Sequence, residues 1–405
     1  MQAARQSGLE RLDEFLPRAG RAYARQRNHD LGADSRDNVS VLSPWIRHRL
    51  ITEQEVVGAV LEHHSPSAAE KFIQEICWRT YWKGWLEMRP DVWSDYLAAL
   101  EHDQDRVTNN TGLQAALDEA ESGRTGIDAF DHWARELNDT GYLHNHARMW
   151  FASIWIFTLK LPWTLGAHFF LRHLLDADPA SNTLGWRWVA GIQTRGKTYL
   201  ARPSNIKKFT DGRFEPSDLA TEAEPLEWKE PPKPQAPDPT AAVDALNDEP
   251  ALLLIHPEDL NPESLLPKTL KFKAAMAFES VDEPYQWPFG QKAKSFVAEG
   301  VEDAVERASA HYDIDSLRKN VLSPEAVIGA CRAADLKSVI TPYAPVGPVA
   351  DALKALARQL GNADIKLHRV RRDWDEFAWP HATKGFFPFK KKIPALLETV
   401  GVLDG

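Results

Sequence analysis

The first 214 residues are patterned like a set of packed helices. Apolar side chains recur there every three or four residues, which is the spacing of one buried helix face. Residues 144–161 are apolar on nearly all sides, so that helix is predicted to lie inside the core. We therefore predict an all-helical region, with helices over residues 8–26, 67–86, 128–137 and 144–161 and another beginning at Ser43-Pro44.

The pattern changes abruptly after residue 214. Residues 215–250 carry eight prolines and many acids, which is typical of a semi-extended linker without a core of its own. Beyond the linker, short apolar runs alternate with amphipathic stretches, which predicts a parallel α/β layer. The predicted strands cover residues 251–255, 274–278, 338–341 and 365–370, and the predicted helices cover residues 301–310, 324–334 and 346–360.

The predicted fold class is therefore α + α/β, in agreement with the two domains expected for 405 residues. A helical domain covers residues 1–214, the linker covers 215–247, and a smaller Rossmann-like domain covers 248–405. The chain closes with a basic and aromatic segment at residues 384–397.

Charge and cysteine content exclude several classes of protein. The net charge of −10 argues against a general polyanion binder, although a local basic patch can still bind nucleic acid. Cys77 and Cys331 are too few for a disulfide framework, a four-cysteine zinc site or an all-cysteine iron–sulfur cluster. The N-terminus lacks a signal-peptide core, and the most apolar run, residues 149–159, is too short to span a bilayer. We expect a soluble, cytoplasmic protein with no metal site.

One phosphate-binding signal is present. Residues 191–198 read Gly-Ile-Gln-Thr-Arg-Gly-Lys-Thr and match the P-loop pattern, in which Lys197 would reach the outer phosphates. A P-loop needs a buried strand before it and a helix after it. Here two tryptophans flank a polar residue before the match, and Pro203 stops any helix soon after it. We interpret the match as accidental and keep a nucleotide hydrolase as a third alternative.

Four motifs occur in order along the helical region. They are Val-Ser-Val-Leu-Ser-Pro at residues 39–44, Glu-x-x-Trp-Arg followed by two aromatics at 75–82, Thr-Gly-Tyr-x-His-Asn-x-x-Arg-Met at 140–149, and Asp-x-Asp with a later Asn and Gly-Trp-x-Trp at 176–188. Jointly they resemble the FAD-binding domain of the cryptochrome/photolyase family. The family's first motif begins with Thr, where this chain has Val39.

The resemblance implies FAD as the cofactor. The hydroxyls and amides of the first motif resemble donors to the FAD diphosphate, placed at a helix start. Arg148 and Asp176 resemble the pair beside the flavin ring, and Asn182 resembles the residue that faces flavin N5. The implied FAD-binding residues are Tyr23, Ser40, Val41, Leu42, Ser43, Phe72, Arg79, Asn145, Arg148, Asp176, Asp178 and Asn182.

Each of these features also has a purely structural explanation. Ser43-Pro44 starts a helix in any protein, and Glu75 and Arg79 are spaced as an ordinary helical ion pair. The tryptophans can simply belong to the core. The motifs favour a flavin site only because they occur together and in the family's order.

The resemblance also implies an electron-transfer chain that reduces photoexcited flavin. Trp163 and Trp186 resemble two of its members. The third is expected within residues 85–110, where Trp85 and Trp93 are both available, and the sequence does not choose between them.

Two functions within the family remain open. In the repairing members, excited reduced FAD donates an electron to a pyrimidine dimer flipped into a neighbouring pocket. The residues that resemble the lining of that pocket in the cyclobutane-dimer enzymes are Glu75, Trp78, Asn145, Met149 and Trp188. His146 lies where repair enzymes often have an Arg that contacts DNA. The histidines required by (6-4) photolyases are absent at Asn145 and Met149, and a basic run over residues 186–213 suits a DNA backbone, although a solvated basic face explains it equally well.

A cryptochrome-like photoreceptor without repair activity is the alternative. Val39 removes one hydroxyl from the phosphate site, and His146 replaces the Arg of repair enzymes. The layout is atypical too, because family members place an α/β antenna domain before the FAD domain. The C-terminal α/β region is either a permuted antenna domain, whose chromophore the sequence does not specify, or a module that binds a protein partner. The favoured hypothesis is light-driven repair of DNA containing cyclobutane pyrimidine dimers.

Overall fold

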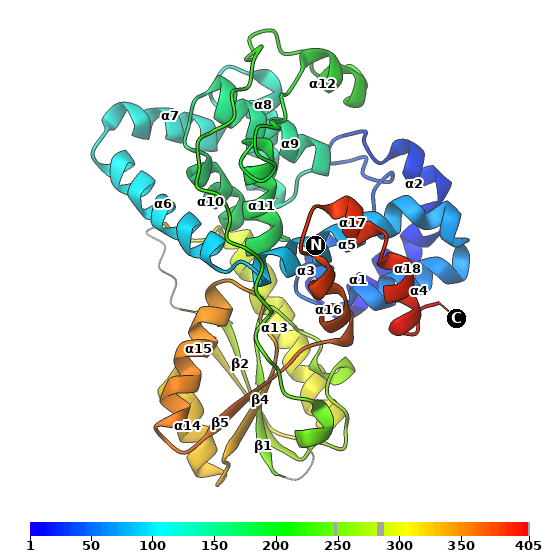
Figure 1. Ribbon diagram of the computed structural model, residues 1–405, viewed down its shortest axis with the longest axis vertical. Coiled ribbons are helices and arrows are strands. Elements are labelled where there is room, and N and C mark those ends of the chain that lie inside the picture. Colours follow the sequence, from blue (N-terminus) through cyan, green and yellow to red (C-terminus); the bar gives the residue numbers. More distant parts are fainter. Residues whose placement is uncertain (247–248, 282–286, 404–405) are drawn as a thin grey trace.

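The computed structural model describes residues 1–246, 249–281 and 287–403. A helical part and a five-stranded sheet with its own helices pack against each other, the sheet lying at the lower end in Figure 1. The predicted α + α/β fold class is confirmed. Among the helices of the described ranges, none is long and apolar enough to cross a membrane.

The N-terminal region is helical throughout, as predicted. The long helix α5 begins one residue before the predicted range 67–86 and is capped by Ser65, whose side chain accepts a hydrogen bond from the Ala68 amide. The reason is that Pro66 follows Ser65 and occupies the first helical turn, where its missing N–H costs nothing. The helices are α1 (Arg5–Phe15), α2 (Arg21–Gln26), α3 (Ser43–Arg47), α4 (Glu53–His63), α5 (Pro66–Glu87), α6 (Asp91–Thr108), α7 (Thr111–Ser122), α8 (Asp128–Thr140), α9 (Asn145–Ser153), α10 (Trp163–His173), α11 (Pro179–Val189) and α12 (Pro203–Phe209).

The predicted buried helix at 144–161 begins at Asn145 and continues past Ser153 as a π-helical segment, Ile154–Thr158. Trp150, Ile154 and Trp155 are fully buried, which confirms that this segment runs through the core. Trp155 donates its indole N–H to the Pro162 carbonyl at 2.9 Å, so the large side chain is accommodated without an unpaired donor.

The sheet is parallel, with strand order β3-β2-β1-β4-β5. Its strands are β1 (Ala251–Ile255), β2 (Phe272–Ser280), β3 (Ser316–Val321), β4 (Ser338–Pro342) and β5 (Lys366–Val370), and its covering helices are α13 (Gln291–Tyr312), α14 (Pro324–Ala333) and α15 (Pro348–Gly361). Strand β3 carries no apolar run and is largely exposed at the sheet edge, which is why the hydrophobic pattern did not predict it.

The two faces of the sheet belong to different cores. Leu252 and Leu254 on β1 pack with α14 and α15, whereas Leu253 and Ile255 on the other face join the core that includes α13 and the helical part. The strand order reverses between β1 and β4, the place where open parallel sheets usually bind ligands. Here the carboxyl ends of these two strands face the helical part (Figure 1).

After β5 the chain returns to the helical part. Three short helices, α16 (Asp373–Ala378), α17 (Phe386–Lys390) and α18 (Ile393–Thr399), follow, and α16 and α17 pack on α5. Trp374 donates to the Thr80 hydroxyl at 2.9 Å, and Trp379 lies against Gly84. The division into domains at residues 214 and 248 stays a prediction, and its last boundary lies at residues 247–248, outside the described residues.

Buried ion pairs join the sheet to the helical part. Arg47 at the end of α3 makes a bidentate pair with Glu258 after β1, both bonds measuring 2.6 Å. The same guanidinium donates its Nε–H to the Ala177 carbonyl at 2.9 Å. Arg372, which follows β5, pairs in the same way with Asp259, which follows β1, at 2.7 and 2.8 Å. Burial alone would raise the pKa of Asp259, but the adjacent arginines outweigh it and lower this pKa to about 2.

The Arg47–Glu258 pair generates a stability prediction. Replacing Glu258 by Gln leaves a buried guanidinium without its counter-charge, so Glu258→Gln is expected to lower the free energy of unfolding by about 3 kcal/mol in urea titrations. The matched control is Glu230→Gln, because Glu230 pairs with Arg195 on the surface, and its expected effect is below about 1 kcal/mol. Equal effects of the two substitutions would contradict the assignment.

A second prediction concerns Glu87, which accepts hydrogen bonds from the Tyr343 hydroxyl and the Val346 amide at the sheet interface. Burial raises the pKa of Glu87 from 4.5 to about 7. A raised folded-state pKa gives stability that is present below the unfolded pKa and lost as pH rises through the folded one. We expect wild type to lose roughly 2 kcal/mol more than Glu87→Gln between about pH 5 and about pH 8. Parallel pH profiles of the two proteins would refute this.

Candidate functional site

The predicted site residues meet at one cavity of about 600 Å³ in the helical part. Its walls come from α2, α5, α9, α11 and the loop before α3. Of the predicted residues, only Leu42 and Trp163 do not line it. Those that do are Tyr23, Ser40, Val41, Ser43, Phe72, Glu75, Trp78, Arg79, Asn145, His146, Arg148, Met149, Asp176, Asp178, Asn182, Trp186 and Trp188.

Helix α5 supplies one wall because its residues at 72, 75, 79 and 82 repeat with helical spacing. Glu75 forms an ion pair with Arg27, which directly follows α2 and also lines the cavity. Burial raises the pKa of Glu75 despite this partner. The Glu75 carboxyl can therefore take a proton and donate a hydrogen bond more readily than an exposed glutamate.

Two arginines and two aspartates lie together in the wall of the cavity. Arg148 donates to Asp176 at 2.9 Å, and Arg79 pairs with Asp178 and donates to the Asp176 carbonyl at 3.2 Å. Burial would raise both aspartate pKa values, but the neighbouring guanidinium groups outweigh it, so the pKa of each lies below its usual range. Both aspartates therefore stay ionised at neutral pH.

Asp178 has a second role as the cap of α11, since its side chain accepts a hydrogen bond from the Ser181 amide at 2.8 Å. This cap fixes the position of Asn182 one residue later. Asn182 donates its amide N–H to the Ala167 carbonyl at 2.7 Å, so its own carbonyl oxygen remains as an acceptor. An acceptor suits a protonated ring nitrogen, such as N5 of reduced flavin.

The loop before α3 brings Ser40, Val41 and Ser43 to the cavity. Val41 has a φ of 56°, a left-handed conformation that is strained for a β-branched residue. Such strain persists only where the surroundings impose it, and it is found preferentially at ligand sites. Leu42 points into the core instead, fully buried, while its backbone N–H donates to the Ser40 hydroxyl at 3.4 Å.

His146 follows the His144 cap at the start of α9 and stacks on Trp150 with ring centroids 4.3 Å apart. Burial lowers the pKa of His144 to about 4 and also lowers the pKa of His146. Both imidazoles are therefore neutral at pH 7. His146 offers a hydrogen bond rather than a positive charge at the cavity rim.

The tryptophans form a series that leads away from the cavity. Trp186 lines the cavity and lies on Gly166, where an added Cβ would come within 2.3 Å of its ring. Trp163 is one turn earlier on α10, and its ring centroid is 5.3 Å from that of Trp228 in the linker. Trp93 reaches Trp163 only through Tyr96, with centroid spacings of 5.3 and 5.6 Å.

Trp228 is the functional candidate that the sequence analysis missed. It lies in the proline-rich linker, where no motif marks it, whereas a third tryptophan was expected within residues 85–110. Trp228 is half-buried, and Arg187 lies over its ring at 5.8 Å. A lone tryptophan in an otherwise polar linker was the only available signal.

The P-loop match does not have the required context. The helix α11 precedes it in place of a buried strand, and residues 191–196 form turns. The amides of such a loop cannot be arranged as in a strand–loop–helix unit. The nucleotide-hydrolase alternative loses its structural basis.

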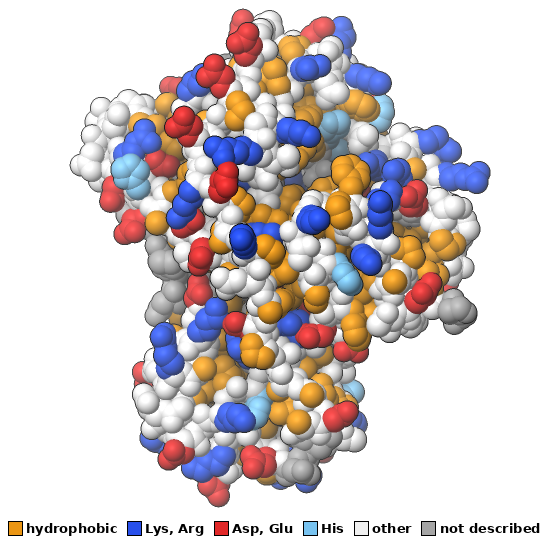
Figure 2. All heavy atoms as spheres, in the orientation of Figure 1, with side chains coloured by type: hydrophobic (Ala, Val, Ile, Leu, Met, Phe, Trp, Pro, Cys, Tyr) orange, Lys and Arg blue, Asp and Glu red, His pale blue; other side chains and the backbone are white. Residues whose placement is uncertain are grey.

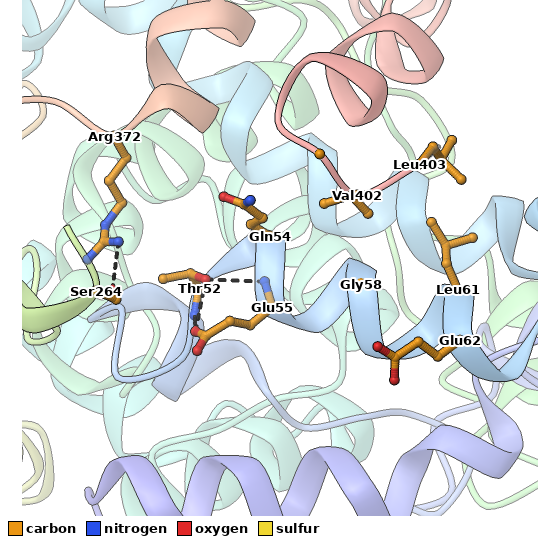
Figure 3. Close-up of a pocket in the computed structure, with 11 residues that line it drawn as sticks. Thr52, Gln54, Glu55, Gly58, Leu61, Glu62, Ser264, Arg372, Val402 and Leu403 are labelled. Carbon is orange, nitrogen blue, oxygen red and sulfur yellow. Dashed lines mark hydrogen bonds between the residues drawn. The ribbon is translucent and has the colours of Figure 1, made fainter. Parts of the chain in front are cut away.

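A second cavity, of about 620 Å³, lies between α4 and the C-terminal residues Val402 and Leu403 (Figure 3). Thr52 and Glu55 in its wall bond each other in the capping box of α4, and Arg372 bonds Ser264. Four polar residues of this wall thus already bond within the fold, and none of the predicted site residues is among those that line it.

The first cavity suits a large polar cofactor. Two buried polar atoms at its wall, Ser181 Oγ and Trp186 Nε1, have no hydrogen-bond partner among the described residues. Unpaired buried polar groups are costly, so their presence at one cavity is an indication of a bound polar ligand. The hydroxyls at residues 40 and 43 can donate hydrogen bonds to a phosphate. The Arg148–Asp176 pair provides charged groups that can bond the polar atoms of a cofactor ring.

Comparison with known proteins finds an FAD-binding domain in the helical part of this chain. Residues 72–216 match the family model described as the FAD binding domain of DNA photolyase. The chain is 36% identical over 159 residues to a deoxyribodipyrimidine photo-lyase of Streptomyces griseus, covering 39% of this chain and 33% of that protein. A deoxyribodipyrimidine photo-lyase of Alkalihalophilus pseudofirmus is 29% identical over 199 residues, covering 47% and 39%. The chain thus spans less than half the length of these curated relatives.

Two solved structures are also similar. A cryptochrome of Synechocystis sp. PCC6803 has 25% identity and a TM-score of 0.44, covering 51% of this chain and 43% of that chain. A class III photolyase of Agrobacterium tumefaciens has 27% identity and a TM-score of 0.42, covering 52% and 43%. From the family match over residues 72–216, this chain carries a photolyase-type FAD-binding domain, which is the part that it shares with the cryptochrome/photolyase family.

Proposed function

We propose that this protein repairs cyclobutane pyrimidine dimers in DNA by light-driven electron transfer from reduced FAD. The observation that carries the proposal is that predicted FAD-binding and predicted dimer-binding residues line one cavity. Arg148, Asp176 and Asn182 lie on the cofactor side, and Glu75 and Trp78 come from α5. A dimer flipped into the cavity would thus lie beside the flavin.

The chain's own groups have distinct parts in this reaction. Bound reduced FAD supplies the electron on excitation. Glu75, whose pKa is raised by burial, can donate a hydrogen bond to a pyrimidine carbonyl and stabilise negative charge that develops there. The indoles of Trp78 and Trp188 provide apolar surfaces for the bases, and the neutral Asn145 amide can bond their polar edges.

A photoreceptor without repair activity is the second candidate, and one contact favours it. Phe386 of α17 stacks on Trp78 with ring centroids 3.7 Å apart and planes 11° apart. One face of an indole predicted to pack against the dimer is thereby covered by the protein itself. In this case the C-terminal region would contact a protein partner.

Repair is tested by illuminating the reduced protein with an oligonucleotide that contains one dimer. We expect light-dependent loss of the dimer, and Glu75→Gln should slow it by roughly tenfold or more, because proton donation to the carbonyl is lost. Flavin absorbance of the variant should equal that of wild type. Unchanged dimer levels with flavin-loaded wild type would reject repair and favour the photoreceptor.

The series of tryptophans gives a separate prediction. If electrons reach the cavity through Trp163 from Trp228, then Trp228→Phe should slow light-driven reduction of oxidised flavin in the presence of a thiol, while Trp85→Phe should not. Transient absorption of the oxidised tryptophan should lose its long-lived component only in the former variant. Loss of reduction in Trp93→Phe instead would place the path through Tyr96.

A further inference from the structure

Helix α17, the second-last helix of the described chain, packs beside the cavity. Phe386 stacks on Trp78, which lines the cavity, and Phe389 contacts Tyr81 with ring centroids 5.5 Å apart. The Tyr81 hydroxyl donates to the Lys384 carbonyl at 2.8 Å. These contacts hold residues 384–392 in a defined position at the cavity rim.

The outer side of this segment combines an aromatic ring with positive charge. Phe387 is 78% exposed, more than any other large hydrophobic residue in the described part of the chain. Lys384, Lys391 and Lys392 are exposed and make no ion pair with a described residue. Residues 384–392 contain no acid, although the whole chain has a net charge of −10. The positive charge is therefore local.

A second basic segment borders the cavity through the other rim tryptophan. Trp188 contacts Tyr199 with ring centroids 5.6 Å apart, and Tyr199 lies within the basic run. Lys197 and Arg202 in this run are exposed and have no ion-pair partner among the described residues, whereas the nearby Arg195 pairs with Glu230. Figure 2 shows basic side chains on both sides of the hollow between the surfaces that carry α12 and α17.

We propose that residues 384–392, called here the α17 segment, bind single-stranded DNA next to the cavity, with Phe387 stacking on a base and the flanking lysines contacting phosphates. The inference rests on the proposed function for the type of nucleic acid. It assigns a role to a segment outside the residues that match the photolyase family model.

The combination of groups favours a nucleic acid over a protein. Every base has a π-face that an exposed aromatic ring can stack on, and lysines beside it neutralise the adjacent phosphates. A protein partner would be expected to cover a wider apolar surface, but here Phe387 stands among lysines. The two basic segments on opposite sides of the cavity would hold the strand on both sides of a flipped nucleotide.

The test is fluorescence anisotropy of a labelled single-stranded oligonucleotide, titrated with the full-length protein over a range of salt concentrations. Phe387→Ala should weaken binding at least about fivefold, since stacking on one aromatic ring is lost. The double variant Lys391→Ala, Lys392→Ala should reduce the slope of log affinity against log salt by roughly 1.4. Matched controls are Phe377→Ala, another exposed phenylalanine, and Lys337→Ala with Lys366→Ala, two exposed lysines of the sheet domain.

The substituted side chains are exposed, so flavin content and melting temperature should stay at wild-type values. Wild-type affinity and salt slope in both α17 variants would overturn the proposal, as would a wild-type protein that binds no DNA. Loss of self-association in Phe387→Ala with unchanged DNA binding would also overturn it, in favour of a protein interface. Weakened DNA binding without light-dependent repair in wild type would support this surface and reject only the proposed repair activity.

Discussion

The bidentate pair between Arg47 and Glu258 is the interaction on which the arrangement of the site cavity in the helical part depends. Arg47 ends the short helix that follows the strained, hydroxyl-bearing loop, and it also donates to the Ala177 carbonyl, between Asp176 and Asp178. A residue after the first strand of the sheet thus holds two walls of the cavity at once. The segment after β1 thus helps to hold the loop before α3 and the Asp176–Asp178 segment in place.

The buried ion pairs between the helical part and the sheet depend on one another for stability. Arg49 pairs with Glu53, Asp259 and Asp375, and Arg372 pairs with the same Asp259. Removing one partner leaves an uncompensated charge in a medium of low polarity, which costs more than the intact pair contributes. The network therefore fixes the orientation of the sheet relative to the helices. Arginines from the helical part also lie at the carboxyl end of β1, beside the β1–β4 reversal.

The sequence was most informative where chemistry and local pattern coincide. Periodicity predicted the helical region and four of the five strands. The resemblance carried by the motifs implied the site residues, and seventeen of those nineteen line one cavity. Contacts between distant segments could not be predicted. The polar strand β3 lacks an apolar signal, the stacking of Phe386 on Trp78 joins residues far apart in the chain, and Trp228 reaches Trp163 only through the path of the linker. The roles of the individual site residues stay predictions.

The most direct measurement of this account is FAD titration of wild type and of Arg47→Lys, with Arg202→Lys as a control at an exposed position. The account predicts one FAD bound per wild-type chain and an affinity at least about tenfold lower in Arg47→Lys, because lysine keeps the charge but loses the bond to Ala177 and the bidentate geometry. Unchanged affinity in Arg47→Lys, or a wild-type protein that binds no FAD, would contradict it.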